Sequence, residues 1–91
     1  MNIIKVKDLI SLYNDNDMVI INYIDHSDES EDVSPTYCCM YNDTKKKLLN
    51  STKEEDKFLL DCNVFELELY NNIGVEEDDY LKWRRLWKRS K

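Results

Sequence analysis

One segment, residues 18–25, constrains the fold of this chain more than any other. It reads MVIINYID, and turn-forming residues bound it on both sides. Its wealth of β-branched and aromatic side chains predicts a strand at the centre of a sheet. Residues 36–41 have a similar character, whereas residues 26–35 between them contain Pro35 and no apolar period. We therefore expect two antiparallel strands joined by an exposed loop, the second strand ending at Asn42 and Asp43.

Two helices are expected from apolar residues that recur at intervals of three and four. The first covers residues 6–13 and ends at a polar run. The second begins at an N-cap on Ser51 or Thr52, has an acidic first turn and ends near Asn63. The intervening residues 45–49 fit a helix and a loop equally well.

The rest of the chain before the C-terminal region predicts short extended segments. Residues 64–69 alternate apolar side chains with Glu66 and Glu68, as in a strand with one wet face. Residues 71–74 include the one glycine of the chain, and we expect a turn there. Residues 3–5 allow an additional edge strand.

A final amphipathic helix is expected over about residues 76–90. Glu76 to Asp79 place acids at its start and Lys/Arg residues follow, as the helix dipole favours. Tyr80, Trp83 and Trp87 recur at intervals of three and four, which predicts one apolar stripe.

These elements predict one α+β domain over residues 1–91. We expect a small, mainly antiparallel sheet of three to four strands, with two or three short helices on one face. A domain of 91 residues buries only about 60–65% of the surface of its unfolded chain, so the core is small. With 35% charged residues, most of the surface is ionic.

The charges divide sharply along the chain. Residues 80–91 hold six of the thirteen Lys/Arg and no acid, so residues 1–79 hold seven Lys/Arg and all nineteen Asp/Glu, a net charge of −12. Such a division favours electrostatic binding of a partner over chemistry.

The acidic residues 1–79 allow two hypotheses, one in which the charges bind a partner and one in which they are only solvated. The loop that begins at Asp25 carries five carboxylates in eight positions, and it is either simply solvated or imitates the phosphate charges of DNA. The candidate partner-binding acids are Asp25, Asp28, Glu29, Glu31, Asp32, Asp43, Glu76, Glu77, Asp78 and Asp79.

The basic final helix has three interpretations. Its aromatic residues cap the core, or it lies on RNA or an acidic partner, or it binds the acidic loop of a second copy. The candidate residues for partner or RNA binding are Lys82, Trp83, Arg84, Arg85, Trp87, Lys88 and Arg89. The oligomeric state stays open.

The sequence argues against an enzyme. A single glycine leaves no phosphate-binding loop and weakens any oxyanion-hole proposal. His26, beside Asp25, is the one histidine and has no partner motif that would make it a general base. The acidic loop lacks the central glycine and the ligand spacing of a calcium loop, so we expect neither a metal nor another cofactor.

The cysteines and the N-terminus indicate a reducing compartment. Cys38 and Cys39 are neighbours that face opposite sides of a strand, which fits neither a zinc site nor a redox motif. We expect the three cysteines to be buried reduced thiols, with a reactive Cys62 as the alternative. No signal peptide or membrane span can be drawn, so we expect a cytoplasmic protein that does not bind membranes.

About half of the chain resembles a class of small phage proteins. Residues 6–13, the polar run 15–17 and the apolar residues 18–21 are similar to their opening helix, turn and strand. Residues 59–69 are similar to their later helix-to-strand segment. Among these proteins are the type II-A anti-CRISPR proteins, small acidic inhibitors of the Cas9 nuclease.

This resemblance implies a non-enzymatic phage or mobile-element protein that acts in the host cytoplasm. It would bind Cas9 with its guide RNA where arginines normally meet the guanines beside the target, and carboxylates would replace the DNA there. The basic tail departs from the pattern of these acidic inhibitors. It would have a function if it bound the guide RNA or an acidic patch of the nuclease. The alternative is a small RNA-binding or regulatory module led by the final helix.

Overall fold

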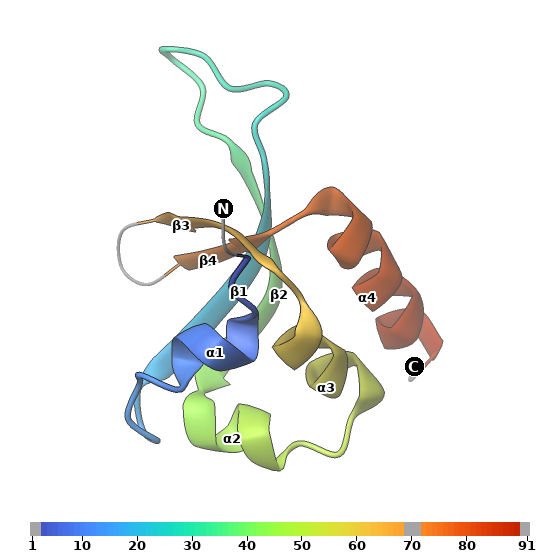
Figure 1. Ribbon diagram of the computed structural model, residues 1–91. Coiled ribbons are helices and arrows are strands. Elements are labelled where there is room, and N and C mark those ends of the chain that lie inside the picture. Colours follow the sequence, from blue (N-terminus) through green and yellow to red (C-terminus); the bar gives the residue numbers. More distant parts are fainter. Residues whose placement is uncertain (1–2, 69–71, 90–91) are drawn as a thin grey trace.

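The computed structural model describes residues 3–68 and 72–89, which form a four-stranded sheet with helices against it (Figure 1). The strands are β1 (Met18–Asp25), β2 (Thr36–Thr44), β3 (Val64–Glu68) and β4 (Asn72–Val75). Their order is β2-β1-β4-β3. β1 pairs antiparallel with β2 and parallel with β4, and β3 pairs antiparallel with β4. The α+β class, the mainly antiparallel sheet and the central position of residues 18–25 are confirmed.

β2 continues further than the sequence predicts. Asn42 and Asp43, expected to end the strand, pair with Ile20 and Val19 of β1. The register shifts in the middle of this pair of strands, so that Met40 is the extra residue of a β-bulge. Met40 is 6% exposed and belongs to the core.

The turn expected over residues 71–74 is wrong for residues 72–74, which open strand β4; residue 71 lies outside the described residues. Ile73 and Val75 are buried, and parallel pairing with β1 satisfies the backbone of this segment. A Cβ atom on Gly74 would stand 2.5 Å from Cγ of Glu66 and 3.2 Å from Cδ1 of Ile24. The glycine therefore serves a close approach of side chains inside the sheet, not a turn.

Four helices occur within the described residues: α1 (Val6–Ile10), α2 (Lys45–Asn50), α3 (Glu54–Asp61) and α4 (Glu77–Arg89). The ambiguous residues 45–49 are thus helical, and the side chain of Thr44 caps them by accepting a hydrogen bond from the Lys47 N–H (3.3 Å). None of the helices in this part of the chain is long and apolar enough to cross a membrane.

The boundaries of α1 and α3 differ from the expectation. α1 ends before Leu12, which is 82% exposed. α3 has Lys53 as its N-cap residue, without a side-chain cap bond. The Ser51 hydroxyl instead accepts a hydrogen bond from the Lys53 N–H (3.2 Å) and donates one to Asp56 (2.7 Å). α3 ends at Asp61, two residues before the expected end.

Residues 3–5 do not form the additional edge strand that the sequence allows. Lys5 makes a single β-bridge with Asn63. The N–H of Val64 donates to the carbonyl of Ile4 (2.7 Å), and the N–H of Val6 donates to that of Cys62 (2.9 Å). The segment is tied to the junction of α3 and β3 by these few bonds.

One face of the sheet carries the core, and helices cover that face (Figure 1). The core cluster takes side chains from the described residues of the three strands β1, β2 and β4 and from each helix or its end: Val6, Ile10, Val19, Ile21, Met40, Leu48, Leu59, Cys62, Ile73, Val75 and Trp83. Because side chains alternate along a strand, the residues between them project from the opposite, open face. The expected packing of helices on one face is confirmed.

Candidate functional site

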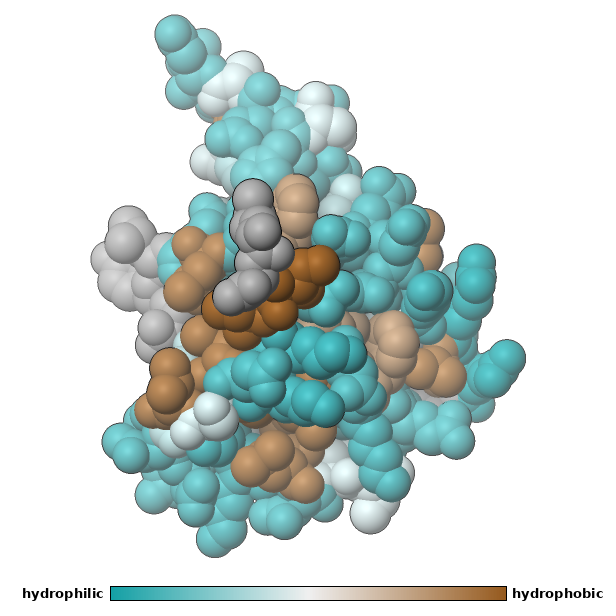
Figure 2. All heavy atoms as spheres, in the orientation of Figure 1, coloured by the Kyte–Doolittle hydropathy of each residue, from teal (hydrophilic) through white to brown (hydrophobic). Residues whose placement is uncertain are grey.

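The loop between β1 and β2 projects from the body of the protein (Figure 1). Its residues 26–34 are exposed, including all four of its predicted partner-binding acids beyond Asp25. Figure 2 shows the projecting part as mostly hydrophilic, whereas apolar side chains gather on the body beneath it. Short backbone bonds shape the loop, such as that from the Ser30 N–H to the Val33 carbonyl (2.9 Å). The expectation of an exposed loop is confirmed.

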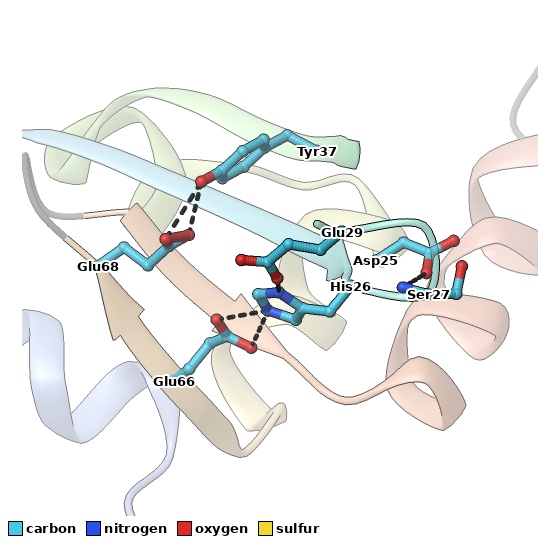
Figure 3. Close-up of polar contacts among 7 residues, drawn as sticks. All are labelled: Asp25, His26, Ser27, Glu29, Tyr37, Glu66 and Glu68. Carbon is cyan, nitrogen blue, oxygen red and sulfur yellow. Dashed lines mark hydrogen bonds and ion pairs between the residues drawn. The ribbon is translucent and has the colours of Figure 1, made fainter. Parts of the chain in front are cut away.

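His26 fastens the base of this loop to the sheet (Figure 3). Its Nδ1 contacts Oε2 of Glu29 within the loop, and its Nε2 lies 3.0 and 3.1 Å from the two carboxylate oxygens of Glu66 on β3. Hydrogen bonds to Glu29, and then to Glu66, raise the pKa of His26 above its ordinary value. In its protonated form the ring donates to both carboxylates at once.

A second link on the open face joins β2 to β3. The hydroxyl of Tyr37 donates to the carboxylate of Glu68 at 2.8 and 3.1 Å (Figure 3). This hydrogen bond, together with burial and the nearby charges of Glu68, Glu29 and Glu66, raises the pKa of Tyr37. Glu29 of the loop and Glu66 and Glu68 of β3 are therefore close enough to raise the pKa of the same tyrosine.

The exposure of β3 is the reverse of the expected pattern. Phe65 and Leu67 are 63% and 56% exposed, whereas Glu66 and Glu68 are partly covered by the residues they bind. β3 is the last strand of the sheet, so its apolar side chains find little to pack against. The alternation is visible in the sequence, but nothing in it marks Glu66 or Glu68 as partners of the loop. Leu69, the end of the expected strand, lies outside the described residues.

The base of the loop also meets the start of α4. Asp25 and His26 line a hollow of about 360 Å³ together with Glu76 and Glu77. Nearby, the hydroxyl of Tyr23 donates to Glu77 at 3.5 Å. Burial, and then the charges of Glu77 and Asp25, raise the pKa of Tyr23. Acids from two distant parts of the sequence thus converge here.

We call this combined region the acidic surface. It comprises Asp25, Asp28, Glu29, Glu31, Asp32, Glu66, Glu68, Glu76 and Glu77. Asp78 is exposed on the first turn of α4 beside it.

Two predicted acids do not belong to the acidic surface. Asp43 lies near the far end of β2, where it accepts hydrogen bonds from the Thr44 N–H (2.7 Å) and Lys47 (3.4 Å). Asp79 is partly buried and accepts a hydrogen bond from the N–H of Asn63 (3.2 Å). Their carboxylates serve local structure, because each satisfies a backbone donor.

The charged residues of α4 are exposed, but its rings are not all available. Lys82, Arg84, Arg85, Lys88 and Arg89 all face solvent. Trp83 is 6% exposed and lies in the core. Trp87 is only partly buried.

A continuous aromatic stack explains the position of these rings. Tyr23 of β1 stacks on Tyr80 (5.1 Å between ring centroids), Tyr80 on Trp83 (6.2 Å) and Trp83 on Trp87 (5.9 Å). The planes differ by at most 22°. The first interpretation of α4, that its rings cap the core, applies to Trp83.

The cysteines differ in their surroundings. Cys62 is 1% exposed, and burial raises its pKa to about 12, which keeps the thiol protonated and argues against reactivity. Cys39 is exposed, so the expectation of buried thiols is wrong for it, whereas Cys38 is partly buried. The two neighbours pair with Asn22 and Tyr23, on opposite faces of the sheet as expected.

Metal ligation finds no support in this geometry. Among residues 3–68 and 72–89, no three His, Cys, Asp or Glu side chains are grouped so that they could hold a metal ion. The arrangement is instead suited to binding cationic groups by charge. Comparison of the chain with protein-family models, curated proteins and solved structures gave no match.

Proposed function

We propose that this protein is a non-enzymatic inhibitor that binds a nucleic-acid enzyme through its acidic surface, in the place of DNA. The observation that carries the proposal is the projecting acidic loop, whose base is linked to the sheet by His26. Following the resemblance of its helices and strands, we take the target to be Cas9 with its guide RNA, and the origin to be a phage or mobile element. The protein would act in the host cytoplasm.

Charge display is the physical basis of the proposed mimicry. DNA carries one negative charge per about 1.7 Å of its axis, so a mimic must present many carboxylates on a compact surface. Carboxylates accept paired hydrogen bonds from arginine, the residue with which enzymes of this kind read DNA. The acids of the loop stand clear of the body, which would let them enter a groove built for a duplex.

The surroundings of the reactive side chains support a binding role. His26 already contacts two carboxylates and faces no serine or cysteine among its recorded partners. Cys62 is enclosed in the core and keeps its proton. Neither group is arranged as a nucleophile with its base.

The test is inhibition of target-DNA cleavage by guide-loaded Cas9. Reversal of Asp28, Glu29, Glu31 and Asp32 to lysine should weaken inhibition, and added salt should weaken inhibition by the native protein. A matched variant reverses four exposed acids elsewhere: Asp8, Asp15, Glu54 and Asp61. It should inhibit nearly as well as the native protein. Full inhibition by the loop variant would overturn the role of the loop.

A second candidate function, RNA binding by α4, rests on a separate observation. Arg84, Arg85 and Lys88 line one surface hollow of about 240 Å³ together with Leu81. Clustered arginines suit phosphate groups. Replacement of Arg84, Arg85, Lys88 and Arg89 by glutamine should abolish binding to a labelled RNA under this hypothesis. The same variant should still inhibit Cas9 if the acidic surface alone is responsible.

A further inference from the structure

A cleft of about 580 Å³ lies between β2, the end of α4 and the start of α3, away from the acidic surface. Five consecutive residues of β2, Cys39 to Asp43, form one wall, and Trp83 and Trp87 form another. Lys53, Glu55 and Asp56 complete the lining. β2 is the outermost strand, so within the described residues no strand pairs with its outer edge.

The Trp83 ring brings an unsatisfied donor to this cleft. Its Nε1–H is buried and has no hydrogen-bond partner in the described part of the chain. Most buried donors in proteins are paired, because an unpaired one loses its bonds to water without replacement. Trp87, which stacks on Trp83 at 5.9 Å and is only partly buried, lies beside it. A carbonyl group that entered here would give the indole an acceptor.

The charge of the cleft selects the kind of ligand. Three acids, Asp43, Glu55 and Asp56, line the cleft with one base, Lys53, and a second base, Lys47, contacts Asp43 at 3.4 Å. Because the acids remain in excess, a phosphate backbone is disfavoured and a cation is favoured. Asp56 accepts one recorded bond, from Ser51, and a carboxylate has about four acceptor positions. A cation that reaches these acids also enters a cleft lined by Trp83 and Trp87, and the face of an indole ring attracts positive charge.

We infer that this cleft binds an extended basic segment of a partner protein. The backbone of the segment pairs with the outer edge of β2, as in β-strand addition. A lysine or arginine side chain reaches Asp43 and Asp56 beside Trp87, and a peptide carbonyl accepts from Trp83. This site is separate from the acidic surface and does not depend on the proposed inhibition of a nuclease.

The experiment uses tryptophan emission, because both tryptophans of the chain line the cleft. The probe is a short capped peptide that alternates arginine and valine, titrated into the full protein. A peptide with glutamate in place of arginine is its control. We expect a saturable change in emission with the basic peptide, weakened by salt, and none with the acidic one.

Variants locate the bound peptide. Asp43→Asn with Asp56→Asn should weaken binding about tenfold or more, because two charge-assisted hydrogen bonds are lost. Asp28→Asn with Asp32→Asn removes the same charge from the loop and should leave peptide binding nearly unchanged. Circular dichroism establishes that both variants fold. No emission change, or equal weakening by the two variants, would overturn the inference.

A second copy of the chain is the rival occupant, since its own α4 is basic. Sedimentation of the protein alone distinguishes the two. A dimer that disappears in the Asp43→Asn, Asp56→Asn variant would overturn the inference in favour of self-association, and a monomer over the concentrations of the titration supports it. Full inhibition of Cas9 by the variant with lysine at positions 28, 29, 31 and 32, with peptide binding intact, would overturn the proposed function alone.

Discussion

Nε2 of His26 lies within 3.1 Å of both carboxylate oxygens of Glu66, so a loop residue and an edge-strand residue share one proton-dependent link. The pKa of His26 is raised by Glu29 and then by Glu66. The link therefore stabilises the fold fully below the ordinary histidine pKa of about 6.5, and this contribution is lost as the pH rises through the raised value. The protection of amides in residues 26–34, measured relative to their intrinsic exchange rates at each pH, should be lower above that value than below it.

Replacement of Glu66 by glutamine tests this link directly. The variant should lower the pKa of His26, because a neutral amide holds the imidazolium less strongly than a carboxylate. Proton NMR reports the titration without ambiguity, since the chain has a single histidine. Glu68→Gln is the matched control on the same strand, because Glu68 binds Tyr37 instead. An equal shift in both variants would mean that only the total charge matters.

Gly74→Ala should also disturb the contact between His26 and Glu66. The added methyl group would stand 2.5 Å from Cγ of Glu66, so the glutamate side chain must shift, which disturbs its contact with His26. We expect a loss of about 1–3 kcal/mol in the free energy of unfolding, as for other overpacked sites, and a lower pKa of His26. Urea unfolding and the NMR titration measure the two effects. In an Glu66→Ala background the loss should be smaller; an undiminished loss would point to Ile24, 3.2 Å away, as the obstacle.

Two leucines that look alike in the sequence should differ strongly when they are truncated. Leu59 is fully buried, so Leu59→Ala should lower the free energy of unfolding by about 2–5 kcal/mol. Leu67 is 56% exposed on β3, and Leu67→Ala should change it by about 0.5 kcal/mol or less. Chemical denaturation compares the two variants with the native protein. Similar losses for both would contradict the exposed position of Leu67.

Thiol labelling should separate the cysteines by their surroundings. Cys39 is exposed and should react quickly with a maleimide in the native protein. Cys62 should stay unmodified until the protein unfolds, because it is buried and its pKa is about 12. Mass spectrometry of the digested protein locates each label, and Cys39→Ser should remove the fast reaction. Modification of Cys62 at the rate of Cys39 would contradict its burial.

Local sequence patterns were sufficient to predict the helices and strands that have a clear apolar pattern. The apolar run 18–25 indicated a central strand, and the stripe through Trp83 indicated the last helix; both are confirmed. β4 was missed because it has only four residues, one of them Gly74, and its pairing with β1 joins distant parts of the chain. Strand propensity carries no information about such long-range partners.

The candidate site was only partly predictable for the same reason. Exposure of the loop followed from its composition, and Asp25, Glu76 and Glu77 were among the predicted partner-binding acids. The strand order brings Asp25 close to the acids at the start of α4, and it places Glu66 and Glu68 within reach of the loop and of β2. No local period in the sequence reveals that order. Asp43 was grouped with them by charge, yet the length of β2 separates it from the loop.

The parallel pairing of β1 with β4 also sets the order in which the sheet is completed. Ile20 pairs with Asn42 on one side, but its partner on the other side is Asn72, which follows the loop, both middle helices and β3 in the chain. Closing so long a stretch of chain costs entropy before any contact repays it, which slows folding. On the ribosome, one edge of β1 therefore stays without a neighbour until most of the chain has emerged. The nascent protein is exposed to mispairing at its most apolar strand from the synthesis of β1 until that of β4.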